Sequence, residues 1–342
     1  MLYALGVGDE LKALSCEATG KEIRLWNSGE TWKLFDLGKV AVERYGYPYF
    51  TVYRPDLLNV LVAAVGRERI HLGARCVGFA QDANGVDLQL EKRKVRGDAL
   101  VGADGVHSTI RQALFGADQP QFTGIIAWRG LVPMEKLPPH MARMVGSNWV
   151  GPGGHVVHYP LRAGKVMNFV GALERSDWQV ESWSARGTTQ ELAADFAGWH
   201  EDVHALIRNI PVPYKWALMT RPPMARWSAG RVTLLGDACH SMVPFLAQGA
   251  VMAIEDGFIL ARALTEGTGD VTSRLSRYEN ARHERTRRAV EGSSGNIARF
   301  HNRALADPAA ARGYVEREWA GQNVADRYEW LFRYDASAVP LQ

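Results

Sequence analysis

The sequence predicts an α/β fold in which a largely antiparallel sheet is inserted between two strand–turn–helix units. Residues 97–111 and 230–264 each contain a short apolar run, a turn with glycine and aspartate, and a helical segment. Between them, residues 121–220 hold several strand-like runs separated by glycine and proline, which is typical of antiparallel strands. We therefore expect one domain of strands and helices with a second domain inserted into it.

The composition is that of an ordinary globular protein, with 46% apolar and 23% charged residues. The net charge of +3 is too small to indicate a nucleic-acid partner. No apolar stretch approaches the roughly 20 residues of a membrane span, and no signal-peptide pattern is present, so we expect no membrane partner. Cys16, Cys76 and Cys239 are isolated, which favours reduced thiols in the cytoplasm. No cluster with metal-ligand spacing is visible, and we expect no metal.

Three strands and a helix are predicted in the first 65 residues. The runs Glu22–Trp26 and Thr31–Leu37 flank the turn residues 27–29, and Tyr49–Tyr53 is a third strand candidate. A helix over Arg54–Val65 is indicated by a proline near its start and an acid in its first turn.

The next segment predicts short strands and a second turn-to-helix unit. Strands are expected over Arg69–Leu72, Ala74–Gln81 and residues 86–91, with a hairpin turn over residues 82–85. Ala99–Ala103 is a buried strand candidate, followed by a turn at Asp104-Gly105 and a helix from Val106. On the local pattern alone, Asp104 serves either a ligand or only the turn.

The inserted region, residues 121–220, predicts five strands and two helices. The strands are expected over Phe122–Val132, Asn148–Gly151, His155–Leu161, Val166–Leu173 and Tyr214–Met219. The helices are expected over Thr189–Trp199, opened by a capping box at Thr188, and over Asp202–Ile210.

Two side chains of this region are catalytic candidates. His155 and Tyr159 are four residues apart in one strand and therefore point to the same face, whereas His158 points to the other. A histidine and a phenol on one face are suited to orient and deprotonate a substrate hydroxyl. The alternative is that Tyr159 only packs in the sheet and that His155 is an exposed strand end.

Residues 230–264 carry the strongest ligand-binding pattern. A buried strand over residues 232–235 ends at Asp237, and Gly249-Ala250 open a long helix. The free amides of a helix N-terminus favour an electron-rich ligand, and open α/β sheets bind ligands at the carboxyl ends of their strands. Asp237 is therefore placed to accept hydrogen bonds from ligand hydroxyls.

The C-terminal part is predicted to be helical over residues 271–295 and 308–334. Arginines of the first helix alternate with glutamates, which indicates a solvated face rather than a nucleic-acid surface. Aromatic residues of the last segment are available to pack on the sheet or on a partner subunit, so a homodimer is one possibility.

Two motifs resemble a known family. Residues 236–257, GDACHSMVPFLAQGAVMAIEDG, are similar to the GD motif of FAD-dependent aromatic hydroxylases of the p-hydroxybenzoate hydroxylase fold group, in the version of salicylate hydroxylase-like and 6-hydroxynicotinate monooxygenase-like members. The segment from Asp104 to Arg111 resembles the D-G-x-x-S-x-x-R motif of that family, and the two motifs occur in family order.

The resemblance implies roles for residues around the GD motif. The aspartate matching Asp237 binds the ribityl and ribose part of FAD. The proline matching Pro244 lies by the reactive edge of the isoalloxazine, and the amides matching Gly249 and Ala250 face flavin N1 and O2.

Three further FAD contacts are implied by the resemblance. The arginine matching Arg54 reaches the phosphates and ribityl chain, for which a forked guanidinium is suited. A backbone contact to the adenine end comes from the position of Cys76, and the aspartate matching Asp104 helps to hold the pyrophosphate region. The alternatives are a turn-capping arginine at position 54 and a merely packed thiol at position 76.

The fold implied by the resemblance is an FAD-binding Rossmann-like domain with an inserted antiparallel-sheet substrate domain. The FAD-binding domain would comprise residues 1–17, 54–120 and 230–342, and the substrate domain residues 18–53 and 121–229. The implied activity is hydroxylation of a small phenolic or heteroaromatic acid of the salicylate, hydroxybenzoate or hydroxynicotinate class with NAD(P)H and O2, through a flavin C4a-hydroperoxide. Epoxidation or N-hydroxylation on the same fold is the alternative.

The start of the chain departs from the family pattern. The family begins with a strand, a G-x-G-x-x-G turn and a helix, and Gly6-Val7-Gly8-Asp9 follows no strand and opens no such turn. We therefore expect a domain truncated at its N-terminus, and an FAD-poor, inactive fragment is a further alternative.

Overall fold

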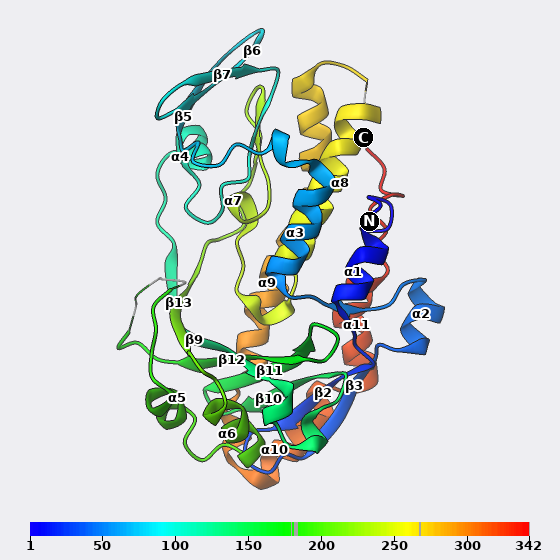
Figure 1. Cartoon of the computed structure of the whole chain (residues 1–342), viewed down its shortest axis with the longest axis vertical. Coiled ribbons are helices and arrows are strands. Elements are labelled where there is room, and N and C mark those ends of the chain that lie inside the picture. Colours follow the sequence, from blue (N-terminus) through cyan, green and yellow to red (C-terminus); the bar gives the residue numbers. More distant parts are fainter. Residues whose placement is uncertain (179, 181–183, 267, 342) are drawn as a thin grey trace.

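Figure 1 shows a seven-stranded sheet at one end of the molecule and a bundle of helices that leads away from it toward two smaller sheets. The computed structural model describes residues 1–178, 180, 184–266 and 268–341. The large sheet has the strand order β13-β9-β12-β11-β10-β2-β3, and all neighbours are antiparallel except β10 and β2. Its strands are β2 (Gly20–Leu25), β3 (Thr31–Asp36), β9 (Gln121–Pro133), β10 (Val145–Gly151), β11 (Gly154–Leu161), β12 (Val166–Glu174) and β13 (Tyr214–Thr220).

Successive residues of these strands point to opposite faces of the sheet, and each face has its own core. Ile126, Trp128 and Trp149 lie on the face that packs against α5 (Thr189–Asp195) and α6 (Glu201–Arg208). The neighbouring residues in each strand point to the opposite face, where Ile125 and Val150, among others, form a second core with the C-terminal helices. The second face is the one that carries His155, and we call it the inner face.

The predicted α/β part contains a short parallel sheet. Strands β8 (Leu100–Gly102) and β14 (Val232–Leu234) pair in register, and α4 (Thr109–Phe115) and α8 (Gly249–Glu266) follow them along the chain. Among the described residues, no further strand pairs with β8 or β14. The remaining strands are β1 (Cys16–Glu17), β4 (Phe50–Thr51), β5 (Cys76–Asp82), β6 (Gly85–Leu90) and β7 (Lys94–Gly97).

Helices α3 (Arg54–Val65), α8 and α9 (Val271–Phe300) run between the two ends of the molecule (Figure 1). The other helices are α1 (Gly8–Leu14), α2 (Lys39–Tyr45), α7 (Asp237–His240), α10 (Pro308–Glu318) and α11 (Gly321–Phe332). Short 3-10 turns are η1 (Arg67–Arg69), η2 (Met134–Lys136), η3 (Pro139–Met141), η4 (Pro244–Leu246) and η5 (Arg303–Ala306). No helix of the described chain has the length and apolarity needed to cross a bilayer.

Several local predictions were wrong. Residues 69–72 do not form a strand, because Leu72 is 91% exposed and has no neighbouring strand to pack against. Helix α4 begins at Thr109 rather than at Val106, since Ser108 is its N-cap and accepts a hydrogen bond from the amide of Arg111. Strand β7 was missed because all of its residues are exposed and give no alternating pattern.

The C-terminal helices differ from the prediction in one respect. The arginines of α9 do not form one solvated face, because Arg282 is fully buried and Arg285 is almost so. Val315, Trp319 and Tyr328, from the segment offered as a possible subunit contact, pack on the inner face of this chain's own sheet.

Candidate active site

The turn after β14 is built on a glycine that no other residue replaces easily. Gly236 has φ +65° and ψ −140°, a conformation that L side chains rarely adopt. Its amide donates to the carboxylate of Asp256 at 3.0 Å, so the turn is tied to α8. Asp237 follows at the start of α7 and is exposed at the carboxyl end of the strand.

The loop from α7 to α8 brings the predicted GD-motif residues to one place. A Cβ added at Gly249 would lie 4.0 Å from Oδ1 of Asp237, so this carboxylate lies beside the first turn of α8. Pro244 opens η4 and is exposed, as is Ala250. An open surface is therefore flanked by a carboxylate on one side and by the free amides of a helix N-terminus on the other.

A buried network of charges lies behind this loop. His240 Nε2 donates to Oδ2 of Asp256 at 2.6 Å, and Arg282 Nε donates to Oδ1 of the same carboxylate at 2.7 Å. Arg282 and Arg285 also pair with Glu255, each at 2.7 Å. Burial alone would raise the pKa of Asp256, but His240 and Arg282 together bring that pKa below its usual value. The network fixes α8 to α9 and to the GD turn.

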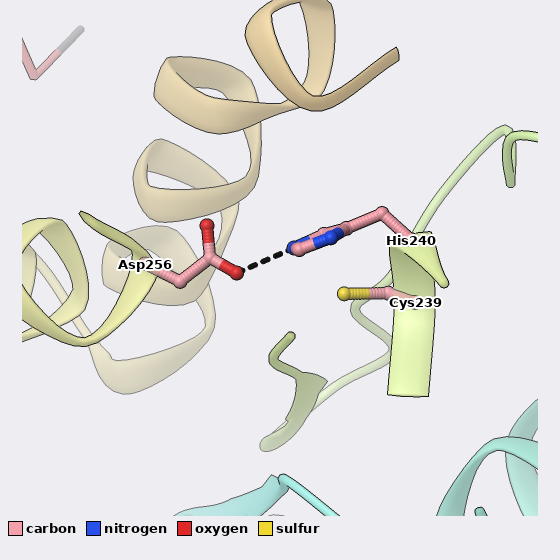
Figure 2. Close-up of side chains that lie close together, drawn as sticks. All are labelled: Cys239, His240 and Asp256. Atoms are coloured by element: carbon pink, nitrogen blue, oxygen red, sulfur yellow. Dashed lines mark hydrogen bonds and ion pairs between the residues drawn. The ribbon is translucent and has the colours of Figure 1, made fainter. Parts of the chain in front are cut away.

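Figure 2 shows the side chain of Cys239 next to His240, with its sulfur toward Asp256. One potential metal-ligand atom from each of the three lies within 4.8 Å of the others, a grouping that the sequence spacing did not indicate. Burial and the nearby Asp256 raise the pKa of the Cys239 thiol, which opposes the thiolate that a metal requires. Both oxygens of Asp256 are already engaged, so we interpret the grouping as structural.

His155 and Tyr159 share the inner face, as the alternation predicts, with Val157 between them. They lie about 13 Å apart along β11, at roughly 3.3 Å per residue. His155 is not the exposed strand end that was the alternative, because it is only 1% exposed. Its ring meets that of Phe245 in η4 at 4.6 Å between centroids.

Burial shifts the pKa values of His155 and Tyr159 in opposite directions. Burial and the nearby charges of His301 and Lys21 lower the pKa of His155 well below its usual value, so its imidazole is neutral at pH 7. Burial raises the pKa of Tyr159 to about 12, so its phenol stays protonated. The inner face therefore presents a neutral base and a hydrogen-bond donor.

A lysine that the sequence did not single out lies on the same face. Lys21 of β2 is opposite Gly146 of β10, and a Cβ at Gly146 would lie 3.8 Å from Cβ of Tyr159. Lys21 and Tyr159 thus flank a position without a side chain. Burial lowers the pKa of Lys21. Within the described part of the chain, no carboxylate lies within 4.0 Å of its ammonium, although every buried cation favours one.

Comparison with known proteins decides the family. A family model described as "FAD binding domain" matches residues 1–293. The chain belongs to this FAD-binding family. A 3-amino-4-hydroxybenzoate 2-monooxygenase of Streptomyces platensis is 36% identical over 99% of the chain and 85% of its own length. A 6-hydroxynicotinate 3-monooxygenase of Bordetella bronchiseptica is 32% identical over the whole chain and 84% of its own length.

Solved structures agree with this assignment. Klebsiella pneumoniae HpxO, determined with FAD and uric acid, has a TM-score of 0.83 and 26% identity over the whole chain and 86% of its own length. A salicylate hydroxylase bound to its substrate has a TM-score of 0.80 and 25% identity over 98% of the chain and 86% of its own length. The α/β fold with an antiparallel sheet is therefore confirmed, and the chain is an FAD-dependent monooxygenase.

Two other residues for which FAD contacts were predicted are Asp104 and Cys76. Asp104 accepts from Ser108 Oγ at 2.5 Å and from the amide of Thr109 at 2.7 Å, so both of its oxygens serve the start of α4. Cys76 is half-buried in β5, and its thiol lies 3.7 Å from the carbonyl of Gly78. These contacts agree with the structural alternatives for both residues, and their FAD contacts stay predictions.

Arg54 is exposed at the first residue of α3. The pKa of Arg129, on the inner face of β9, is lowered mainly by the burial of that side chain and also by the positive charge of Arg54. The first residue of α3 therefore lies near the sheet.

The residues of this site fit part of an FAD molecule. Gly249 at the N-terminus of α8 lies beside the exposed Asp237, and even an added Cβ would stay 4.0 Å from that carboxylate, so there is space between them. The surface therefore suits the ribityl chain and the flavin ring, whereas the described residues offer no glycine-rich turn for the pyrophosphate.

A small cavity adjoins Asp237 on the side of α4. Its volume is about 130 Å³, and its lining includes Arg111, Asp118 and Arg221. Asp118 pairs with Arg221 at 2.7 Å and with Arg111 at 3.3 Å, so one half-exposed carboxylate faces two buried guanidinium groups. Nη1 of Arg221 is buried without a hydrogen-bond partner in the described chain. The cavity lining therefore holds two guanidinium groups and two carboxylates, those of Asp118 and Asp237, and one guanidinium nitrogen in it has no partner among the described residues.

Proposed function

We propose that this monooxygenase hydroxylates a small phenolic or heteroaromatic acid, with O2 and NAD(P)H as co-substrates. The observation that carries this proposal is the inner face of the sheet, where the ammonium of Lys21 on β2 lies two strands from the protonated phenol and the neutral imidazole of β11. A hydroxylated ring with a carboxylate complements all three groups. The relatives named for aminohydroxybenzoate and hydroxynicotinate support the same substrate class.

We assign the cofactor to the surface between α7 and α8. Asp237 would accept hydrogen bonds from the ribityl hydroxyls, the amides of Gly249 and Ala250 would face the pyrimidine edge of the flavin, and Pro244 would lie by its reactive edge. Arg54 would bind the phosphates from α3. When bound, FAD supplies the redox chemistry that passes reducing equivalents from NAD(P)H and activates oxygen for transfer.

The chain's own residues prepare the substrate. His155 accepts the proton of the ring hydroxyl, and the resulting oxyanion raises the electron density of the ring carbons. Tyr159 donates a hydrogen bond, because its phenol remains protonated. Lys21 pairs with the substrate carboxylate, which relieves the cost of its own burial. The aromatic residues around His155 keep water from the reacting groups.

We place an anionic group of NAD(P)H at the cavity beside Asp237. The unpartnered guanidinium nitrogen of Arg221 in the lining supports this assignment. Three free cysteines support a reducing, cytoplasmic location for the enzyme.

The test starts with the visible spectrum of the purified protein before and after addition of FAD. The FAD-saturated protein is then mixed with NADH or NADPH and with 3-hydroxybenzoate, 6-hydroxynicotinate or 3-amino-4-hydroxybenzoate under ¹⁸O₂. We expect incorporation of one ¹⁸O atom on a ring carbon of one of these acids. A protein that stays colourless with added FAD is the inactive fragment, and ¹⁸O on nitrogen or in an epoxide assigns the alternative reaction.

A further inference from the structure

Three polar side chains lead in a line from the inner face of the sheet to the protein surface. Nδ1 of His155 and Nε2 of His301 share a hydrogen bond of 2.7 Å. Nδ1 of His301 lies 3.3 Å from Oε1 of Glu174, within ion-pair distance but without the geometry of a hydrogen bond. The two imidazoles are 1% and 3% exposed, whereas the Glu174 side chain is 36% exposed. The line thus begins at a buried base and ends in water.

The backbone holds these three side chains in place. His301 is the C-cap of α9, and its carbonyl accepts from the amide of Gly153 at 3.1 Å. The carbonyl of Gly153 in turn accepts from the amide of Glu174 at 2.9 Å. The end of α9, the β10–β11 turn and the end of β12 are therefore joined by main-chain bonds, and the order of the side chains follows from this junction.

The carboxylate at the outer end sets the proton positions along the line. A carboxylate only accepts, so the His301 Nδ1 that faces Glu174 carries the hydrogen and Nε2 of His301 holds a lone pair. His155 then donates its Nδ1–H to that lone pair. The remaining nitrogen of His155, Nε2, is left unprotonated, which is the form that a general base requires.

We propose that His155, His301 and Glu174 form a proton relay that carries the proton of the substrate hydroxyl out to solvent. This proposal rests on the proposed function of the inner face. The substrate O–H bond breaks as the His155 Nε2–H bond forms. The Nδ1–H proton of His155 moves to Nε2 of His301, the Nδ1–H proton of His301 moves to Oε1 of Glu174, and Glu174 releases that proton to water. One proton enters, one leaves, and no electrons are exchanged.

The surroundings favour passage of the proton over storage. Phe245 and Phe300 pack on His155, and the Lys21 charge faces it from β2. Glu174 and Arg303 face His301 from the outer side, with Arg303 Nη2 2.5 Å from Oε2 of Glu174. Burial lowers the pKa of His301 to about 4, so at pH 7 neither imidazole retains the proton that it receives. His301 and Glu174 are positioning and relay residues, because neither faces the substrate.

The first test reads the tautomers directly, without substrate or activity. The full chain is labelled with ¹⁵N-histidine, and two-bond ¹⁵N–¹H correlations assign which ring nitrogens carry hydrogen. We expect His155 and His301 each to carry hydrogen on Nδ1 and none on Nε2. Hydrogen on Nε2 of His155 overturns the relay.

The second test follows proton release when 3-hydroxybenzoate or 6-hydroxynicotinate is mixed with the FAD-saturated protein and a pH indicator. In Glu174→Gln and His301→Gln we expect release on the order of tenfold slower or more, because neither amide can pass on a proton. Ligand affinity and flavin content should stay unchanged. Glu30→Gln is the matched control, since Glu30 has a 33% exposed side chain paired with Arg312 at 2.5 Å but no neighbouring histidine in the line.

The two proposals fail in distinguishable ways. Failure of every phenolic acid to bind overturns the proposed substrate class and leaves the tautomer result to decide the relay. Binding with wild-type proton release in both relay variants overturns the relay and leaves the substrate class intact. Should His301→Gln not fold, Glu174→Gln at the surface gives the same decision.

Discussion

Removal of Arg282 should destabilise the protein strongly, because this side chain is the cation between two buried carboxylates. Arg282→Met keeps most of the volume but leaves Asp256 with only Gly236 and His240, and Glu255 with only Arg285. Breaking a buried ion pair by removing one partner costs about 3–5 kcal/mol. With an unfolding entropy of roughly 2.1 cal/mol/K per residue over 342 residues, this cost corresponds to a fall in Tm of about 4–7 °C.

The measurement is thermal unfolding followed by circular dichroism, with FAD titration of the folded variant. Arg287→Met is the matched control, because Arg287 lies on the same helix and its ion pairs within the described chain are with the exposed Glu284 and Glu291. Such surface pairs contribute about 0–1 kcal/mol. We also expect weaker FAD binding in Arg282→Met, since α8 is no longer fixed to the GD turn. Equal Tm values for the two variants would refute the role assigned to the network.

Four further outcomes are expected. Asp237→Ala should weaken FAD binding by about 1.5–3 kcal/mol in a folded protein, measured by fluorescence titration, and unchanged affinity removes Asp237 from the site. Tyr159→Phe should slow hydroxylation and raise NAD(P)H consumption per product at unaltered flavin content, whereas wild-type coupling returns it to a packing role. Lys21→Met should weaken binding of 3-hydroxybenzoate about tenfold or more, but not that of FAD, and equal affinity contradicts the carboxylate contact. Burial holds the pKa of His158 at about 3, so this histidine stays neutral in the folded state while the unfolded chain takes up a proton below about pH 6.5. Urea unfolding should therefore show stability falling between about pH 6.5 and pH 4, and the fall should be smaller in His158→Asn.

Much of the fold follows from local patterns in the sequence. The strands around His155 and Tyr159 were predictable from their apolar runs, and their shared face followed from the two-residue period of a strand. The GD turn was predictable because a glycine at positive φ and a helix N-terminus are local features. The same locality explains the failure at residues 69–72, where an apolar pattern exists without a neighbouring strand to bury it.

The site itself was only partly contained in those patterns. Asp237, Pro244, Gly249 and Ala250 lie within fourteen consecutive residues, so the sequence placed them together before the fold did. Cofactor contacts that depend on distant segments, such as that of Arg54, rested on the family resemblance. The hydrogen bonds that Asp104 accepts at the start of α4 account for this residue without a ligand.

What the sequence by itself determined is the fold class, the alternation of the strands and the GD loop, because each depends on residues within a few positions of one another. Only the tertiary structure decided which of the similar arginines of α9 is buried, as Arg282 faces two carboxylates of α8 while Arg287 faces water. It also decided that Lys21 and Tyr159 lie on the two strands that flank Gly146 of β10. His301 likewise contacts His155 although the two residues are 146 positions apart in the chain. These contacts join segments that are remote in sequence. The burial and the electrostatic surroundings of each side chain therefore depend on which distant residues pack against it, and not on its residue type.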